Sequence, residues 1–180
     1  MDLSKLPASL VSQLISAVEA FIASSRKKYG RQAVPMTPAQ RTAMQPFFAP
    51  EILDQARLVT LHGRRVENPP FYAIAKLMGI RNVPSFSDLT AVTFVDVIVS
   101  HEEFSDSLLF HELVHAAQFA QMGTKDFASR YVKGFLHGGG SYEEIPLEKN
   151  AYELEKRFSE NKEAFSVADE IRGWMEAGKL

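Results

Sequence analysis

The sequence has no cysteine, and this absence excludes several kinds of site at once. Disulfide frameworks, thiolate metal sites and cysteine nucleophiles all depend on a sulfur atom that the chain does not have. Any metal site must therefore be built from histidine and carboxylate side chains. A chain without cysteine also fits a reducing compartment, so we expect a cytoplasmic protein.

Basic charge is not in excess either. Lysine and arginine number 20 against 22 aspartate and glutamate residues, which gives a formal net charge of −2. Proteins that hold nucleic acid do so with clustered lysine and arginine side chains that face the phosphates. We therefore expect no nucleic-acid partner, and the sequence leaves the oligomeric state open.

Long apolar runs are missing as well, because no stretch approaches the roughly 18 uninterrupted apolar residues of a membrane helix. The most apolar segment near the start is Leu10–Ser25, which Gln13, Ser16 and Glu19 interrupt. Its apolar residues recur every three to four positions, the period of an amphipathic helix that packs on a core. We therefore predict neither a membrane partner nor a signal sequence.

What the chain does contain is enough apolar side chains to build a core, since 46% of its 180 residues are hydrophobic. Helical periodicity dominates, and only Arg57–His62 and Ala91–Ser100 have the β-branched pattern of strands. We predict an α+β fold that is mostly helical with a small sheet. Residues 1–50 would form an N-terminal helical extension packed on a core domain of residues 51–180. The predicted helices cover residues 1–30, 38–45, 50 onward, 71–78, 106–121, 124–136, 146–159 and 164–177.

The predicted helix over residues 106–121 carries the pattern His-Glu-x-x-His, with His111, Glu112 and His115. Residues four apart lie one turn apart on nearly the same helix face, so both imidazoles can reach one metal ion. Neutral imidazoles suit zinc, and a water bound to zinc reaches a pKa near 7. Glu112 projects to the side of the pair, where it can act as the base without being a ligand.

The helix around this pattern is strongly apolar, which argues against two ordinary surface histidines. Leu109, Phe110, Leu113 and Val114 are typical of a buried helix. Two histidines and a glutamate buried without partners would be costly. We therefore predict a zinc site in the interior.

A four-coordinate catalytic zinc needs a third protein ligand, and a run of glutamates after the glycine triplet supplies the candidates. Pro146 favours a helix that begins beside it, which places Glu148 in a rigid first turn. Glu144 would stay in the preceding loop and is the chief alternative. Glu143 and Glu153 are further candidates, since acidic residues are favoured near a helix start in any case.

The sequence resembles the gluzincin-type zinc metallopeptidases in the order of its elements. A strand and a polar loop are followed by His-Glu-x-x-His on a buried helix and then by Glu-x-x-Ala on a later helix. The sequence looks most like the minimal bacterial forms of these peptidases, over roughly Arg57–Phe158. The resemblance implies a zincin-like fold with a small sheet beside the metal helix. It also implies that Glu148 is the third zinc ligand and that Ala91–Ser100 is the sheet edge that binds extended substrate.

The sequence departs from the family pattern at Tyr152. Many members have aspartate at this position, where it orients a ligand histidine from behind. Asn150, Glu144 or a backbone carbonyl could take over that task here.

Three further side chains are candidates for stabilising the oxyanion of the reaction. His137 directly precedes three glycines, and Tyr131 and Tyr142 flank the same region. Core packing is the alternative for the tyrosines, and an exposed surface position is the alternative for His137. With Glu112 as the base, we predict His137 and Tyr142 as its catalytic neighbours.

We therefore predict a zinc-dependent metallopeptidase that hydrolyses a peptide or protein substrate with metal-activated water. One alternative is a catalytically silent zincin-fold module with a binding or regulatory role. Another is a toxin or effector protease with one protein target. The presence of Glu112 argues against the silent module, because a purely structural zinc site has no use for an unligated base. The side-chain preference of the substrate stays open.

Overall fold

Proline marks the first residue of three helices. The computed structural model describes residues 6–69, 72, 85–161 and 163–180. The three helices are α2 (Pro38–Met44), α3 (Pro50–Gln55) and α6 (Pro146–Glu160). Proline suits the first turn because the N–H that it lacks would have no helical partner there. Thr37 also caps α2, since its hydroxyl accepts a hydrogen bond from the backbone N–H of Gln40 at 3.2 Å.

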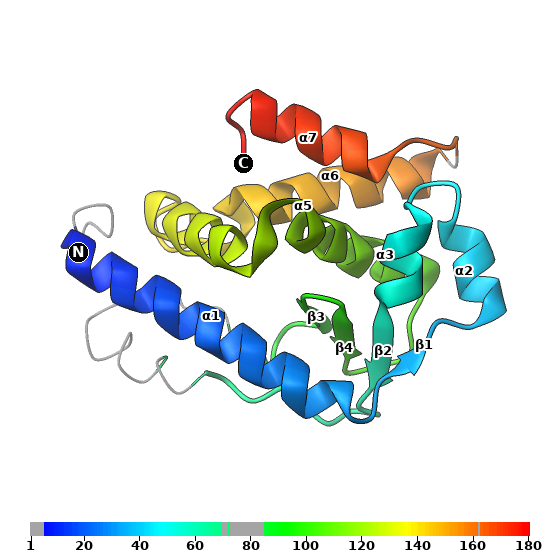
Figure 1. Cartoon of the computed structure of the whole chain (residues 1–180), viewed down its shortest axis with the longest axis horizontal. Helices are drawn as coiled ribbons and strands as arrows, with labels where there is room; N and C mark the ends of the chain where they lie inside the picture. Colours follow the sequence, from blue (N-terminus) through cyan, green and yellow to red (C-terminus); the bar gives the residue numbers. More distant parts are fainter. Residues whose placement is uncertain (1–5, 70–71, 73–84, 162) are drawn as a thin grey trace.

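The longest helix, α5 (Asp106–His137), is two helical stretches joined at a kink. Gly123 lies at the kink with φ 74° and ψ 166°, a conformation that other residues rarely adopt. The predicted break at this glycine is confirmed (Figure 1). Two further helices lie near the predicted positions, α1 (Ala8–Gly30) and α7 (Val167–Glu176). The helix predicted over residues 71–78 falls outside the described residues, apart from Tyr72.

Four short strands form one mixed sheet in the order β1-β2-β4-β3. They are β1 (Val34–Pro35), β2 (Arg57–Thr60), β3 (Ala91–Phe94) and β4 (Val97–Ser100). β2 runs parallel to β4, whereas β1 and β3 are antiparallel to their neighbours. The predicted fold class, α+β with a small sheet, is therefore confirmed.

The single strand predicted over Ala91–Ser100 is wrong, because the structure folds this segment into the hairpin of β3 and β4. Val95 and Asp96 form the turn, and Val95 has a φ of 65°, which is unusual for a β-branched residue. Arg26 of α1 holds the Asp96 carboxylate with two contacts of 2.5 and 2.7 Å. This contact comes from a distant part of the chain, so the local pattern of apolar residues could not reveal the turn.

The main core lies where α5 meets the sheet on one side and α6 and α7 on the other (Figure 1). Phe47, Phe110 and Phe158 pack together there with ring centroids 4.4 to 5.5 Å apart. Phe47 precedes residue 50, so the first fifty residues contribute to the same core as α5 and α6. The domain division at residue 50 stays a prediction.

Helix α1 runs along α5 and the hairpin, and its inner face carries Ile22 and Tyr29 in buried positions (Figure 1). We expected no segment long and apolar enough for a membrane span, but α1 has an 18-residue window with a mean hydropathy of 1.3. Only 11% of that window is buried. Length and composition alone do not separate a membrane span from a signal sequence or a packed helix, so the cytoplasmic location stays a prediction.

Candidate metal centre

The first half of α5 places two histidines side by side in the interior. His111 and His115 are each 6% exposed, and their Nε2 atoms lie 3.2 Å apart. The spacing of four residues puts both side chains on one helix face, as the sequence predicted. The two Nε2 atoms therefore face the same point.

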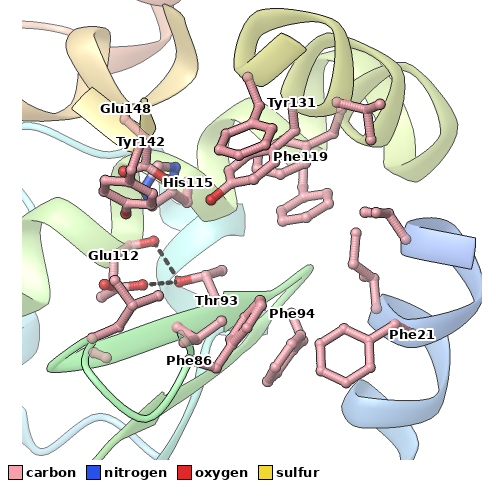
Figure 2. A pocket seen from close by; sticks show the side chains of 18 of the residues that line it. Phe21, Phe86, Thr93, Phe94, Glu112, His115, Phe119, Tyr131, Tyr142 and Glu148 are labelled. Atoms are coloured by element: carbon pink, nitrogen blue, oxygen red, sulfur yellow. Dashed lines mark hydrogen bonds and ion pairs between the residues drawn. The ribbon is translucent and has the colours of Figure 1, made fainter. Parts of the chain in front are cut away.

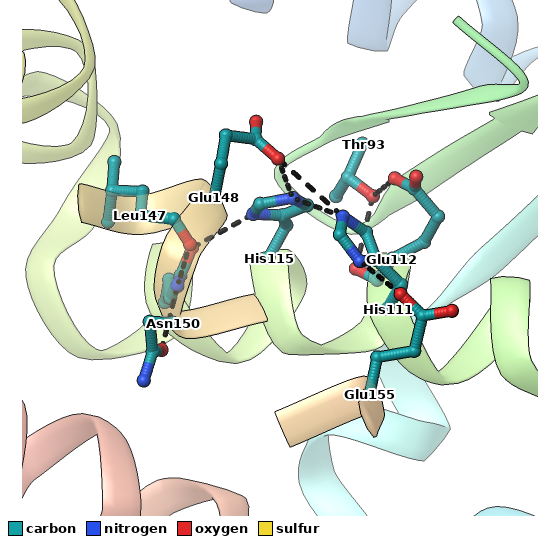
Figure 3. A network of polar contacts seen from close by, with 9 residues as sticks. Thr93, His111, Glu112, His115, Leu147, Glu148, Asn150 and Glu155 are labelled. Carbon is teal, nitrogen blue, oxygen red and sulfur yellow. Dashed lines mark hydrogen bonds and ion pairs between the residues drawn. The ribbon is translucent and has the colours of Figure 1, made fainter. Parts of the chain in front are cut away.

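Helix α6 brings a carboxylate to that point. Glu148 is 3% exposed, and its Oε2 lies 3.3 Å from Nε2 of His115 and 3.6 Å from Nε2 of His111 (Figure 3). Because α6 begins at Pro146, Glu148 occupies its first turn. The three residues form a buried group that could hold a metal ion.

The other nitrogen of each imidazole has its own partner, and neither partner was predicted. Nδ1 of His111 lies 2.9 Å from Oε2 of Glu155, and Nδ1 of His115 lies 2.9 Å from Oε1 of Gln118 (Figure 3). Such contacts fix the orientation of a ligand imidazole and leave Nε2 free for a metal. The amide of Gln118 in turn donates to the carbonyl of Leu147 and to Oδ1 of Asn150, both at 3.0 Å.

Helix periodicity could have shown that these two residues share a helix face with the ligands. Glu155 follows Glu148 by seven residues and Gln118 follows His111 by seven, which is two turns along the same helix face. We had expected Asn150, Glu144 or a backbone carbonyl to hold a histidine directly. In the structure Asn150 acts one step further out, through Gln118, while Tyr152 contributes its ring beside His111, at 4.6 Å between centroids.

The charges of the cluster support one another. Burial alone would lower the pKa of His111 and His115, but nearby carboxylates, Glu148 in both cases and Glu155 for His111, raise it instead. Burial alone would raise the pKa of Glu148, yet the two imidazoles hold it below its usual range. The buried carboxylate thus needs positive charge beside it, which protons or a metal ion can supply.

The positions of the three donor atoms fit a tetrahedral metal site. Bonds of about 2.0–2.1 Å at tetrahedral angles place ligand atoms roughly 3.3 Å apart. The observed separations are 3.2, 3.3 and 3.6 Å. In addition, Oε2 of Glu148 is buried and makes no hydrogen bond of acceptable geometry among the described residues, although both imidazole Nε2 atoms lie within ion-pair distance of it. A buried charged oxygen in that state is costly, and a cation would satisfy it.

Glu112 lies beside the cluster without belonging to it. Its side chain is 4% exposed, and the hydroxyl of Thr93, on β3, donates to its Oε2 at 2.6 Å. This contact aims the carboxylate toward the hairpin (Figure 2). Glu112 therefore lies next to the cluster without being one of its three ligand candidates, and its role as a base stays a prediction.

Three tyrosines, Tyr72, Tyr131 and Tyr142, line the same cavity as Glu112, His115 and Glu148. Tyr131 and Tyr142 are the two that the sequence offered as candidates (Figure 2). Tyr142 comes from the 3₁₀ turn before α6, and Tyr131 comes from the second half of α5. Burial, followed by the charge of Glu148, raises the pKa of both phenols well above the usual range. Both therefore keep their protons and can donate a hydrogen bond.

The structure does not bring the remaining candidates to the cluster. His137 is exposed at the end of α5 and lines a separate hollow against α1, so the prediction that it stabilises the oxyanion finds no support in its position. Glu144 is exposed and pairs with Lys149 at 2.6 Å. Glu143 and Glu153 are exposed as well.

A third buried histidine has no part in the cluster. His101 is 0% exposed. Its Nε2 accepts a hydrogen bond from the backbone N–H of Val66 at 3.0 Å, and Arg65 lies 2.8 Å from its Nδ1. It holds the loop after β2 against the end of β4. Burial, reinforced by the charge of Arg65, lowers its pKa.

Comparisons with known proteins do not identify this chain. No protein-family model, no curated protein and no solved structure matches it. The zincin-like fold and the gluzincin family therefore stay predictions, and the residues of the cluster alone indicate its chemistry.

Proposed function

We propose that the protein is a zinc-dependent metallopeptidase of the gluzincin type. The observation that carries the proposal is the buried convergence of two imidazole nitrogens and one carboxylate oxygen, with an unligated glutamate beside them. Two histidines and a glutamate are a ligand set of catalytic zinc, which leaves one position open for water or substrate. When bound, the zinc would polarise the scissile carbonyl and make water a usable nucleophile near neutral pH.

In this proposal the metal ligands have one role and the residues that orient them have another. His111, His115 and Glu148 would hold the metal, while Glu155 and Gln118 fix the two imidazoles. This division explains why the two Nδ1 atoms are occupied and the two Nε2 atoms converge.

Glu112 would take the proton from the attacking water and pass it to the leaving amine. Thr93 orients its carboxylate. Tyr142 and Tyr131, both protonated, are the candidates to donate a hydrogen bond to the oxyanion of the substrate.

The position of β3 supports a peptide as the substrate. Among the described strands, β4 is paired on both edges, whereas β3 is paired only with β4. An extended peptide can add to such an edge through main-chain hydrogen bonds. Because Thr93 of β3 touches Glu112, a peptide on this edge would pass beside the cluster.

The experiment is metal analysis of the purified protein together with hydrolysis of a broad peptide mixture, for wild type and for Glu112→Gln. We expect about one zinc per chain in both, and cleavage by the wild type only, because glutamine keeps the shape but cannot act as the base. Loss of zinc in Glu112→Gln would mean that Glu112 is a ligand. Zinc without hydrolysis of any peptide in the wild type would favour the silent binding module. Cleavage of a single protein and no peptide would favour the effector protease.

A further inference from the structure

A cavity extends from the metal cluster to helix α1, and no step of the proposed reaction uses its far end. The cavity has a volume of about 140 Å³. Helix α5 and strand β3 form two of its walls, and α1 forms the third (Figure 2). The lining residues from α1 are Leu14, Val18, Phe21 and Ile22.

Polar side chains gather at one end of this cavity. Glu112, His115 and Glu148 are the charged residues among the described lining residues, and all three belong to the cluster or touch it. The far end is lined by apolar side chains, among them Phe21 and Phe94, whose ring centroids are 5.8 Å apart. A group that enters from the cluster would therefore leave a polar environment and be buried among hydrocarbon.

The volume of the cavity indicates the size of that group. An engineered apolar cavity of about 150 Å³ stays dry and binds benzene. The space here would hold one aromatic ring or one branched aliphatic side chain. A fatty acyl chain is much larger, so the volume favours a side chain over a lipid tail.

Strand β3 explains how a side chain would reach the cavity. Residues Ala91–Phe94 line it along one side. A peptide paired with the edge of β3 that has no strand partner among the described residues would present successive side chains to opposite faces. The residue whose carbonyl lies near Glu112 would then have a neighbour that points into the apolar space.

We propose that this cavity is a specificity pocket for one bulky apolar side chain, of the size of leucine or phenylalanine, next to the scissile peptide bond. Helix α1 lies outside the segment that resembles the metallopeptidases, and it forms the far wall of the pocket. It therefore sets the depth of the pocket in this chain. The inference rests on the proposed function, because it assumes that a peptide is the substrate.

The test uses the zinc-loaded Glu112→Gln variant, which cannot turn substrate over, and measures peptide binding by calorimetry. The probes are peptides that differ at one position, with phenylalanine, leucine, alanine or aspartate. We expect the phenylalanine and leucine peptides to bind about tenfold or more tightly than the alanine peptide, since burial of a large apolar side chain accounts for such a ratio. Equal binding of all four peptides would overturn the proposal.

Substitutions on α1 test the role of that helix. Val18→Phe and, as a second variant, Leu14→Trp should fill the pocket and remove the preference for large side chains. Ala20→Phe is the matched control, because Ala20 is exposed on the same helix and does not line the cavity. Each variant is first checked for its helical circular dichroism and its zinc content. A preference that survives in both pocket variants, with fold and zinc intact, would contradict the inference.

The outcomes separate this inference from the proposed function. If the wild type cleaves peptides without regard to apolar side chains, the pocket assignment fails and the hydrolase stands. If the wild type cleaves no peptide but the binding preference for large apolar side chains is present, the proposed peptidase activity is wrong and the assignment of the pocket is supported. Displacement of the bound peptide by a free fatty acid at lower concentration than by the leucine peptide would overturn the choice of a side chain.

Discussion

Three histidines are buried in this protein, and their surroundings shift their pKa values in opposite directions. Burial alone would lower the pKa of each imidazole. At His101 nothing reverses this effect, so the pKa is lowered. At His111 and His115 the adjacent carboxylate of Glu148 more than reverses it, so the pKa is raised.

The difference lies in what each ring nitrogen faces. His101 has backbone and Arg65 contacts at both nitrogens, and its role is complete without any ligand. His111 and His115 each use one nitrogen for a fixed partner and turn the other toward a carboxylate oxygen that has no hydrogen-bond partner among the described residues. Burial of a histidine is therefore no sign of a ligand site, whereas convergence on an unsatisfied anion is.

The largest effect expected from this comparison follows removal of a ligand. His111→Ala or His115→Ala should weaken zinc binding by more than about a hundredfold. This is a larger loss of affinity than the removal of a residue that only orients a ligand imidazole would cause. His101→Leu should keep its zinc. Metal analysis after dialysis against a weak chelator measures the difference. Equal zinc retention in His115→Ala and wild type would show that the cluster is not the metal site.

A smaller effect is expected at the partners that hold the imidazoles. Glu155→Leu and Gln118→Leu should each weaken zinc binding about 10- to 100-fold, because the ligand rings lose their orientation. Glu155→Gln should restore part of the loss, since its amide oxygen can still accept from Nδ1. Competition with a fluorescent zinc chelator gives the affinities.

The matched control for Glu155 is Glu153→Leu. Glu153 lies two residues away on α6, is exposed, and makes no contact with the cluster in the described structure. A loss of affinity as large in Glu153→Leu as in Glu155→Leu would point to a general effect of charge on α6.

The effect expected at His101 is on stability and on its pH dependence. His101→Leu leaves the buried N–H of Val66 without its acceptor, which costs about 1–3 kcal/mol in the free energy of unfolding. The pKa of His101 in the folded protein lies below the usual 6.5. The contribution of neutral His101 to the free energy of unfolding is therefore complete above pH 6.5 and is lost as the pH falls from 6.5 through the folded-state pKa. Urea unfolding of the metal-free protein between about pH 5 and 8 measures both.

In His101→Leu this part of the pH dependence should disappear. An unfolding free energy that falls toward acid pH as steeply in the variant as in the wild type would assign the effect to other groups. The comparison is made without metal, so zinc release from the cluster cannot mimic it.

The smallest effect is expected at the rejected ligand candidate. Glu144→Gln should change zinc affinity by less than about twofold, because Glu144 is exposed and paired with Lys149. The loss of such a surface pair costs at most about 1 kcal/mol of stability. Release of zinc by Glu144→Gln but not by Glu148→Gln would reverse the assignment of the third ligand.

The sequence alone determined those features whose cause is local. Helical periodicity, with Pro146 as a start and Gly123 as a break, placed α5 and α6 correctly. The spacing of four residues then put His111 and His115 on one face. For the same reason Glu148 could be preferred over Glu144, since only Glu148 lies inside an α-helix, whereas Glu144 ends the short 3₁₀ turn before it.

The tertiary structure decided the features whose partners are far apart in the chain. The segment Ala91–Ser100 folds into a hairpin, and its turn contacts Arg26, about seventy residues away in the chain. Glu155 became a partner of His111, and α1 became a wall of the cavity, only when helices packed together. Local periodicity fixes which way a side chain points along its own helix, but it contains no information on which other segment will lie opposite.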